Sequence, residues 1–201
     1  MSLAKRLTAC GLRTLGQCQD GTDRITLVGP DEPRFWSIFR ESPEYQDGLA
    51  DPLDRWSQRI ITMVAAAEGG TPEFPFGGPP YAPFQSWAAA TGQAWPSPIG
   101  FLVHADVGLF VSFRGAIRQP GTVRTSSETR PCDGCLDQPC LTACPVAAFD
   151  DGYDVARCKA HVRSPAGLDC RQAGCLARRV CPVGQGRRLP AQAAFHMEAF
   201  L

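Results

Sequence analysis

Residues 132–145 read CDGCLDQPCLTACP, a stretch that places four cysteines within one short segment. Two residues separate Cys132 from Cys135, four separate Cys135 from Cys140, and three separate Cys140 from Cys144, which a proline follows. Such short spacings allow several thiolates to converge on one iron–sulfur cluster, and a closing Cys-Pro is typical of these sites. The stretch therefore predicts a small lobe whose folding energy comes partly from metal ligation.

Four further cysteines follow this segment at wider intervals. The gaps after Cys144 contain 13, 11, 4 and 5 residues and end in turn at Cys158, Cys170, Cys175 and Cys181. Cys-Pro-Val occurs at 144–146 and again at 181–183, which indicates a degenerate internal duplication. In two-cluster ferredoxins, the cysteine before the proline serves the other cluster.

That crossover divides the eight cysteines into two sets. The first cysteine set would hold one [4Fe–4S] cluster and contains Cys132, Cys135, Cys140 and Cys181. The second cysteine set would hold another and contains Cys144, Cys158, Cys170 and Cys175. Structural zinc is the alternative, because two sites of four cysteines each would also use eight thiolates. Four cysteines in so short a segment, closed by Cys-Pro, fit the cluster interpretation better.

The composition of the 201-residue chain excludes several classes of function. The chain has 20 basic and 20 acidic residues, and this balance gives no electrostatic basis for binding nucleic acid or an anionic membrane. No apolar stretch approaches the roughly 20 residues of a membrane-spanning helix, and the N-terminus does not resemble a signal peptide. We therefore expect a cytoplasmic protein with reduced thiols. Cys10 and Cys18 lie apart from the other cysteines and are expected to be small buried hydrophobes or free thiols.

Composition also divides the chain into two parts. Residues 1–116 hold 14 of the 18 aromatic residues but only two of the ten cysteines. We expect an α/β domain over residues 1–118, a linker rich in turn formers over 119–129, and a metal-binding lobe with a C-terminal tail over 130–201. The arginines of the lobe would offset thiolate charge, dock an acidic redox partner or form ordinary solvated surface.

The first part shows a mixture of helical and extended patterns. Helices are expected over 3–15, around 35–39, over 53–67 and over 84–91, and a short buried strand over 24–29. Residues 99–104 and 109–116 are expected to pair as a β-hairpin, and 72–83 to form an irregular loop. The predicted fold class is therefore α+β with a mostly antiparallel sheet.

Five residues of this first part are candidates for lining a ligand cleft: Phe76, Gly77, Gly78, His104 and Arg114. Aromatic rings beside glycines allow close approach of a flat ligand, although a rigid loop that packs its own aromatics is the alternative. His104 is a candidate ligand or proton carrier, and Arg114 a candidate partner for a bound charge. A structural histidine and a salt bridge are the corresponding alternatives.

The cysteine order, with 154–158 (DVARC) and 100–110 (GFLVHADVGLF), resembles the cluster domain of epoxyqueuosine reductase and of the cobalamin-dependent reductive dehalogenases. The stretch ending in Arg114-Gly115 is also similar to cobalamin-processing proteins of the cblC type. The resemblance implies a nitroreductase-like domain followed by a ferredoxin-like lobe, with cobalamin and substrate in a cleft between them. It also implies that Cys158 completes the second cluster. The chain has no counterpart of the enzymes' catalytic acid, so no catalytic residue is carried over.

We therefore expect electron transfer through two [4Fe–4S] clusters to a redox partner protein or a small-molecule substrate. The first alternative is a cobalamin-dependent or corrinoid-processing reductase, an oxidoreductase in which the clusters feed electrons to a site between the domains. The second alternative is a zinc-stabilised binding module.

Overall fold

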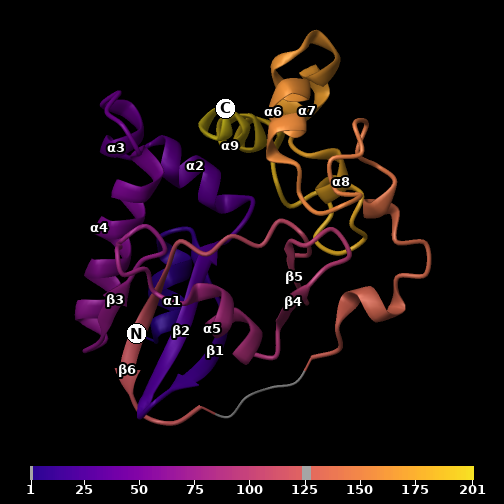
Figure 1. Ribbon diagram of the computed structural model, residues 1–201. Helices are drawn as coiled ribbons and strands as arrows, with labels where there is room; N and C mark the ends of the chain where they lie inside the picture. Colours follow the sequence, from indigo (N-terminus) through magenta and orange to yellow (C-terminus); the bar gives the residue numbers. More distant parts are fainter. Residues whose placement is uncertain (1, 124–127) are drawn as a thin grey trace. The chain divides into compact units, whose positions relative to one another are not determined.

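The computed structural model describes residues 2–123 and 128–201, which belong to two compact units (Figure 1). The first unit comprises residues 1–93 and 112–128, and the second comprises 94–111 and 129–201. Residues 94–111, which the composition placed in the first domain, thus belong to the second unit. The expected linker over 119–129 begins inside a strand of the first unit, and its residues 124–127 lie outside the described part of the chain.

The first unit contains a four-stranded antiparallel sheet in the order β1-β2-β6-β3 (Figure 1). Its strands are β1 (Leu12–Asp20), β2 (Asp23–Pro30), β3 (Thr71–Glu73) and β6 (Gly115–Pro120). Every residue of β2 from Ile25 to Pro30 is buried, as expected for a central strand covered on both faces. The prediction of an α+β fold with a mostly antiparallel sheet is confirmed.

Five helices accompany this sheet: α1 (Leu3–Ala9), α2 (Arg34–Arg40), α3 (Pro43–Gln46), α4 (Pro52–Ala67) and α5 (Phe84–Ala90). Helix α4 packs on β3 and β6, and α5 packs on β1 and β2. The rings of Phe35, Phe39 and Trp56 lie against one another, with centroids between 5.3 and 5.7 Å apart. All three side chains are buried, so the first unit has the aromatic core that its composition predicts.

The expected helix over 3–15 is wrong beyond Ala9, because β1 begins at Leu12. The buried residues of β1 are Leu12, Leu15 and Cys18, at intervals of three residues. The register of β1 against β2 shifts between Thr14 and Gln17, and this bulge replaces the usual two-residue period of a strand. The resulting three-residue period imitates the apolar face of a helix, which explains the error.

The expected hairpin is also wrong. Strand β5 (Leu102–His104) pairs with β4 (Ala94–Pro96) rather than with the residues that follow it. Of the expected second arm, only residues 115–116 lie in a strand, β6, which pairs with β2 and β3. This arm is divided between the units, because the chain passes from the second unit to the first after residue 111.

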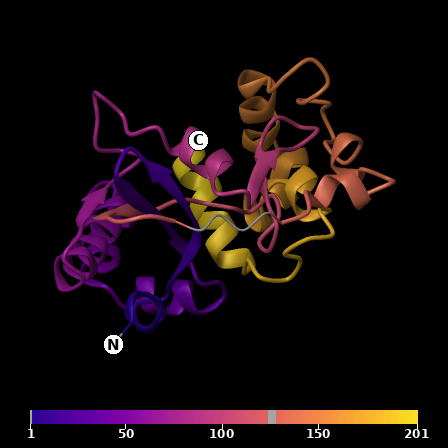
Figure 2. The same ribbon diagram turned by 90° about the horizontal axis from the view of Figure 1, so that it is seen from below.

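The second unit consists of short elements joined by irregular segments, as Figure 2 shows. Besides β4 and β5 it contains η1 (Pro131–Gly134), η2 (Pro139–Leu141), η3 (Pro165–Gly167), α6 (Val155–Arg163), α7 (Leu168–Ala173), α8 (Leu176–Arg179) and α9 (Pro190–Phe200). Its core contains Ile99, Val103, Leu109, Phe149 and Ala177 together with two cysteines of the first set, Cys140 and Cys181. Among the described helices, none combines the length and apolar character needed to cross a lipid bilayer.

Candidate metal centre

The four residues of the first cysteine set line one narrow pocket in the second unit. Cys132 lies in η1, Cys135 directly follows it, and Cys140 lies in η2. Cys181 comes from a distant part of the chain, after α8. The folded chain thus brings the cysteine of the second Cys-Pro to the three cysteines of the first short segment. Apolar side chains, including Val103 and Leu109, form further walls of this pocket.

The thiols that line this pocket influence one another electrostatically. Burial raises the pKa of Cys132, and the neighbouring thiols of Cys181 and Cys135 raise it further. Burial likewise raises the pKa of Cys140, to which Cys132, Cys181 and Cys135 all add. Thiolates in this arrangement would repel one another, and the Arg130 guanidinium lowers the pKa of Cys132 against that effect.

Gly108 allows the segment that carries Cys181 to approach closely. Its main chain forms hydrogen bonds of 3.0 and 3.1 Å with the main chain of His104, and its φ is +60°. A Cβ atom at Gly108 would lie 2.1 Å from the carbonyl oxygen of Val183 and 3.3 Å from Cys181 Sγ. Glycine is therefore required at this position for both conformation and space.

The second cysteine set is distributed over the helices of the same unit. Cys158 lies in α6, Cys170 lies in α7, and Cys175 directly precedes α8. Burial raises the pKa of Cys170, and Cys158 contributes to that rise. Burial also raises the pKa of Cys175, to which Cys170 adds. Three members of this set are therefore within electrostatic reach of one another, and Cys144 packs on the same apolar core as Cys175.

Backbone N–H groups donate to the sulfur atoms of this second set. The N–H of Ala148 donates to Cys144 Sγ over 3.3 Å. The N–H of Leu176 donates to Cys170, and those of Ala177 and Arg178 donate to Cys175, each lowering the pKa of its acceptor against the effect of burial. Hydrogen bonds to sulfur stabilise thiolates and tune the reduction potentials of iron–sulfur clusters.

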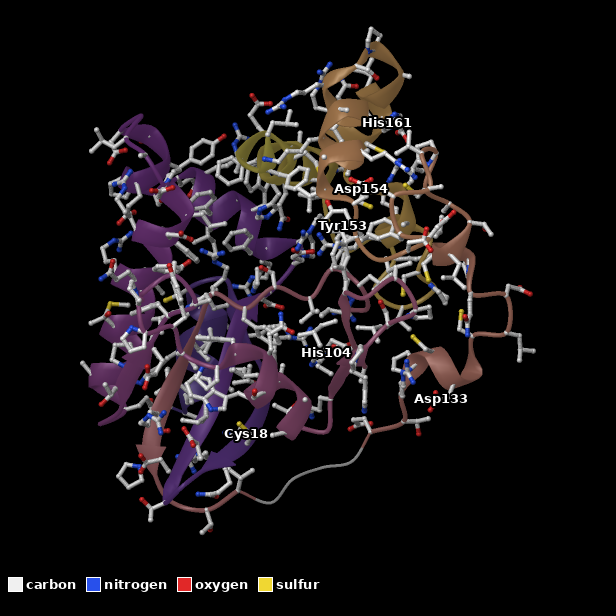
Figure 3. All side chains as sticks on the ribbon, viewed as in Figure 1. Cys18, His104, Asp133, Tyr153, Asp154 and His161 are labelled. Atoms are coloured by element: carbon white, nitrogen blue, oxygen red, sulfur yellow. The ribbon has the colours of Figure 1, made fainter. Side chains whose placement is uncertain are left out.

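Tyr153, which is labelled in Figure 3, belongs to an aromatic cluster and forms a hydrogen bond with Cys158. Its ring stacks on Phe149 with centroids 5.0 Å apart and meets the ring of Phe101 edge-on at 5.1 Å. Burial raises the pKa of Tyr153, and its hydrogen bond with Cys158 raises it further, so the hydroxyl stays protonated. Tyr153 can therefore donate to a thiolate at Cys158. This contact was not anticipated from the sequence, where only its short separation from Cys158 could have indicated it.

Across residues 2–123 and 128–201, no three His, Cys, Asp or Glu side chains are already arranged to hold a metal ion. A [4Fe–4S] cluster does not require three ligands on one ion, because each of its four irons takes one thiolate. The fit of the residues to such a group therefore depends on four thiols lining a shared space. The first cysteine set meets that condition.

No family model, curated protein or solved structure matches this chain.

The five candidate cleft residues are divided between the two units. His104 belongs to the second unit, and the other four belong to the first. Arg114 is 12% exposed, forms an ion pair with Asp54 and donates to Ser57 Oγ over 3.1 Å. His104 is buried, and its Nδ1 accepts a hydrogen bond of 3.0 Å from the N–H of Asp106 (Figure 3). Arg114 therefore takes part in a salt bridge, and His104 takes part in a buried hydrogen bond, as expected for the structural alternatives to ligand binding.

The aromatic loop of the first unit packs largely on itself. Phe76 stacks on Phe74 with ring centroids 5.3 Å apart, and the Arg114 guanidinium lies 5.7 Å from the Phe76 ring. A Cβ atom at Gly78 would lie 2.7 Å from the Tyr81 ring, whereas one at Gly77 would meet Phe74 only at ordinary contact distance. These contacts match the alternative of a loop that covers its own aromatic rings.

The two remaining cysteines lie in the first unit, apart from both sets. Cys18 is fully buried in β1 (Figure 3), and Cys10 is partly buried after α1. Burial raises the pKa of both thiols, so neither has the character of an activated thiolate. The expectation that Cys18 is a small buried hydrophobe is confirmed.

Proposed function

We propose that the second unit binds two [4Fe–4S] clusters and transfers single electrons through them. The observation that carries this proposal is that Cys181 lines the same pocket as Cys132, Cys135 and Cys140. The crossover pattern of two-cluster ferredoxins requires this combination of three clustered cysteines with one distant Cys-Pro cysteine. Pairing within each half of the duplication would instead group Cys144 with the first three.

The clusters would supply the one-electron chemistry, and the chain's own residues would set its potential. Apolar walls around the first set limit access of water. Backbone N–H groups and the Tyr153 hydroxyl donate to sulfur atoms of the second set. Such hydrogen bonds stabilise the added negative charge of a reduced cluster, so they raise its reduction potential.

A shared core supports electron passage between the two sets. Cys140 and Cys181 are members of the apolar core of the second unit, and Cys144 and Cys175 pack against that core from the other set. The two candidate cluster sites are therefore attached to one packed group of side chains rather than to separate lobes. This arrangement favours an internal relay of electrons within the second unit.

Metal and sulfide analysis of protein purified without oxygen tests the proposal. We expect about eight irons and eight acid-labile sulfides per chain, which correspond to two clusters. Cys181→Ser and Cys175→Ser should each lose about half of the iron, because each removes a ligand of one cluster. Cys10→Ser, which removes a cysteine outside both sets, is the matched control and should retain all of it. Two zinc ions per chain without sulfide would overturn the proposal and favour a zinc-stabilised module.

A further inference from the structure

A buried hydroxyl group belongs to the lining of the pocket that holds the first cysteine set. Ser97 lines this pocket and is 7% exposed. Within the described part of the chain, its Oγ atom has no hydrogen-bond partner. A buried hydroxyl without a partner is destabilising, and a group bound in the pocket would supply the missing acceptor.

The main chain holds Ser97 in a fixed position. Ser97 directly follows β4, and its N–H donates to the carbonyl oxygen of Phe101 over 2.8 Å. Its own carbonyl oxygen accepts from the N–H of Gly100 over 3.0 Å, in a turn where Gly100 has a φ of +80°. Arg130 Nη2 holds the preceding residue, because it donates to the carbonyl oxygen of Pro96 over 2.7 Å. The main-chain groups of Ser97 are therefore used within the turn, which leaves its hydroxyl to bind at the pocket.

The walls of this pocket are poor in main-chain donors. Four of the described lining residues are prolines, which carry no N–H group: Pro98, Pro131, Pro139 and Pro182. At the second cysteine set, by contrast, N–H groups of residues 148 and 176–178 donate to the thiols. The first set has hydrogen bonds from Arg130 to Cys132 and from the Cys140 N–H to its own thiol. Ser97 adds the only hydroxyl among the described residues that line the pocket.

The chemistry of a cluster at the first cysteine set makes this hydroxyl a hydrogen-bond donor. Thiolate and sulfide atoms accept hydrogen bonds but cannot donate them, whereas a serine hydroxyl can donate. Hydrogen bonds to charged acceptors are the stronger ones, so a fixed donor stabilises the added negative charge of the reduced cluster. We propose that the Ser97 hydroxyl donates to a sulfur atom of the cluster held by the first cysteine set and thereby raises the reduction potential of that cluster. This inference rests on the proposed function.

Redox titration of the full chain, purified without oxygen, tests this role. Ser97→Ala should keep the iron content of the wild type, because it removes only one oxygen atom. We expect one of the two midpoint potentials to become more negative, with the reduction equilibrium changed about tenfold, or about 59 mV for a one-electron couple. The other potential should stay unchanged, since none of the four described cysteines of the second set lines this pocket.

Two further variants separate the hydroxyl from the size of the side chain. Ser97→Thr keeps the hydroxyl, so its potential should lie closer to that of the wild type than to that of Ser97→Ala. Ser164→Ala is the matched control. Ser164 belongs to the same unit, donates to the carbonyl oxygen of His161 over 2.8 Å and is not among the residues that line the pocket. Its substitution should leave both midpoint potentials unchanged.

Electron–nuclear double resonance of the reduced protein detects the donated proton directly. The wild type should show a proton coupling that disappears after exchange into D₂O and is missing in Ser97→Ala. The inference is overturned if the wild type shows no exchangeable coupling, if Ser97→Ala keeps the coupling or both potentials, or if Ser97→Thr or Ser164→Ala shifts a potential as far as Ser97→Ala does. Zinc in place of iron would refute the proposed function and this inference together. Two intact clusters with unchanged potentials in Ser97→Ala would refute the inference alone.

Discussion

The two units differ in what their cores are made of. The first unit buries large aromatic side chains, such as Phe35 and Trp56, beneath a four-stranded sheet. The second unit has short elements, and its core includes Cys140 and Cys181, which we assign as metal ligands. The first unit can therefore be stable through apolar burial alone, whereas the core of the second would be completed by the proposed ligation of its thiolates. Under the proposed ligation, one chain would obtain its folding energy from two different sources.

Removal of metal should have the largest effect on this contrast. Anaerobic chelation after cluster oxidation should abolish amide-exchange protection across residues 130–183, because the cysteines would lose the group that holds them together. Strands β2 and β6 should keep their protection, since their hydrogen bonds and burial do not involve the cysteine sets. Hydrogen exchange read by mass spectrometry measures both regions in one sample. Equal loss in both units would refute the contrast.

Trp56→Ala should destabilise the first unit and leave the iron sites of the second unit unchanged. This side chain is 1% exposed and contacts the rings of Phe35 and Phe39, so its truncation should destabilise the first unit by about 3–5 kcal/mol. Iron content should remain that of the wild type. Urea unfolding followed by exchange at β2 measures the first effect, and metal analysis measures the second. Loss of iron in this variant would show that the second unit depends on the first.

A smaller and more local effect is expected from Gly108→Ala. The added methyl group would collide with the carbonyl oxygen of Val183, and alanine would be strained at a φ of +60°, at a cost of about 1–3 kcal/mol. Because this position supports Cys181, we expect selective loss of the first cluster. Gly100→Ala is the matched control. Gly100 has a φ of +80° with open space around it, so only backbone strain is introduced. Equal iron contents in the two variants would argue against a supporting role for Gly108.

The smallest effect concerns pH in the first unit. Glu44 accepts hydrogen bonds from Arg59, and these lower the pKa of Glu44 below its ordinary value of 4.5. A lowered carboxyl pKa contributes stability above the pKa of the unfolded chain, and this contribution is lost as pH falls through the folded value. The stability difference between wild type and Arg59→Gln should therefore shrink below about pH 4.

Urea unfolding followed by tryptophan fluorescence measures this difference, because three of the four tryptophans belong to the first unit. Arg34→Gln, which alters an exposed arginine of the same unit, is the control and should show no such pH dependence. A difference between wild type and Arg59→Gln that stays constant from pH 6 to pH 2 would exclude this role for Glu44.

The sequence predicts part of the regular structure of the first unit, but it misses α3, and it misses β3 because residues 72–83 are dense in proline and glycine and are expected to be irregular. Helices α2, α4 and α5 and strand β2 follow from apolar periodicity and from proline and glycine at helix ends. Strand β1 is missed because its bulge gives a three-residue period. The hairpin is misassigned because local patterns cannot show that its second arm is divided between the two units.

For the candidate metal centre, the sequence indicates the cysteines of each set but not the other residues that contact them. Cysteine spacing indicates both sets, and their ligation stays a prediction. The contact between Arg188 and the Phe110 ring could not be derived from the sequence, because these residues meet only through the fold. The role of Gly108 is also found only in the structure, and the contact of Tyr153 with Cys158 is indicated in the sequence only by their short separation.

Two double variants test the partition of the cysteines most directly. Cys132→Ser with Cys181→Ser removes two ligands from the first set, whereas Cys132→Ser with Cys175→Ser removes one ligand from each set. Iron and sulfide analysis after anaerobic purification should give about four irons per chain for the first pair and almost none for the second. Equal iron contents in the two variants, or more iron in the second, would contradict the crossover assignment on which the proposed electron-transfer function depends.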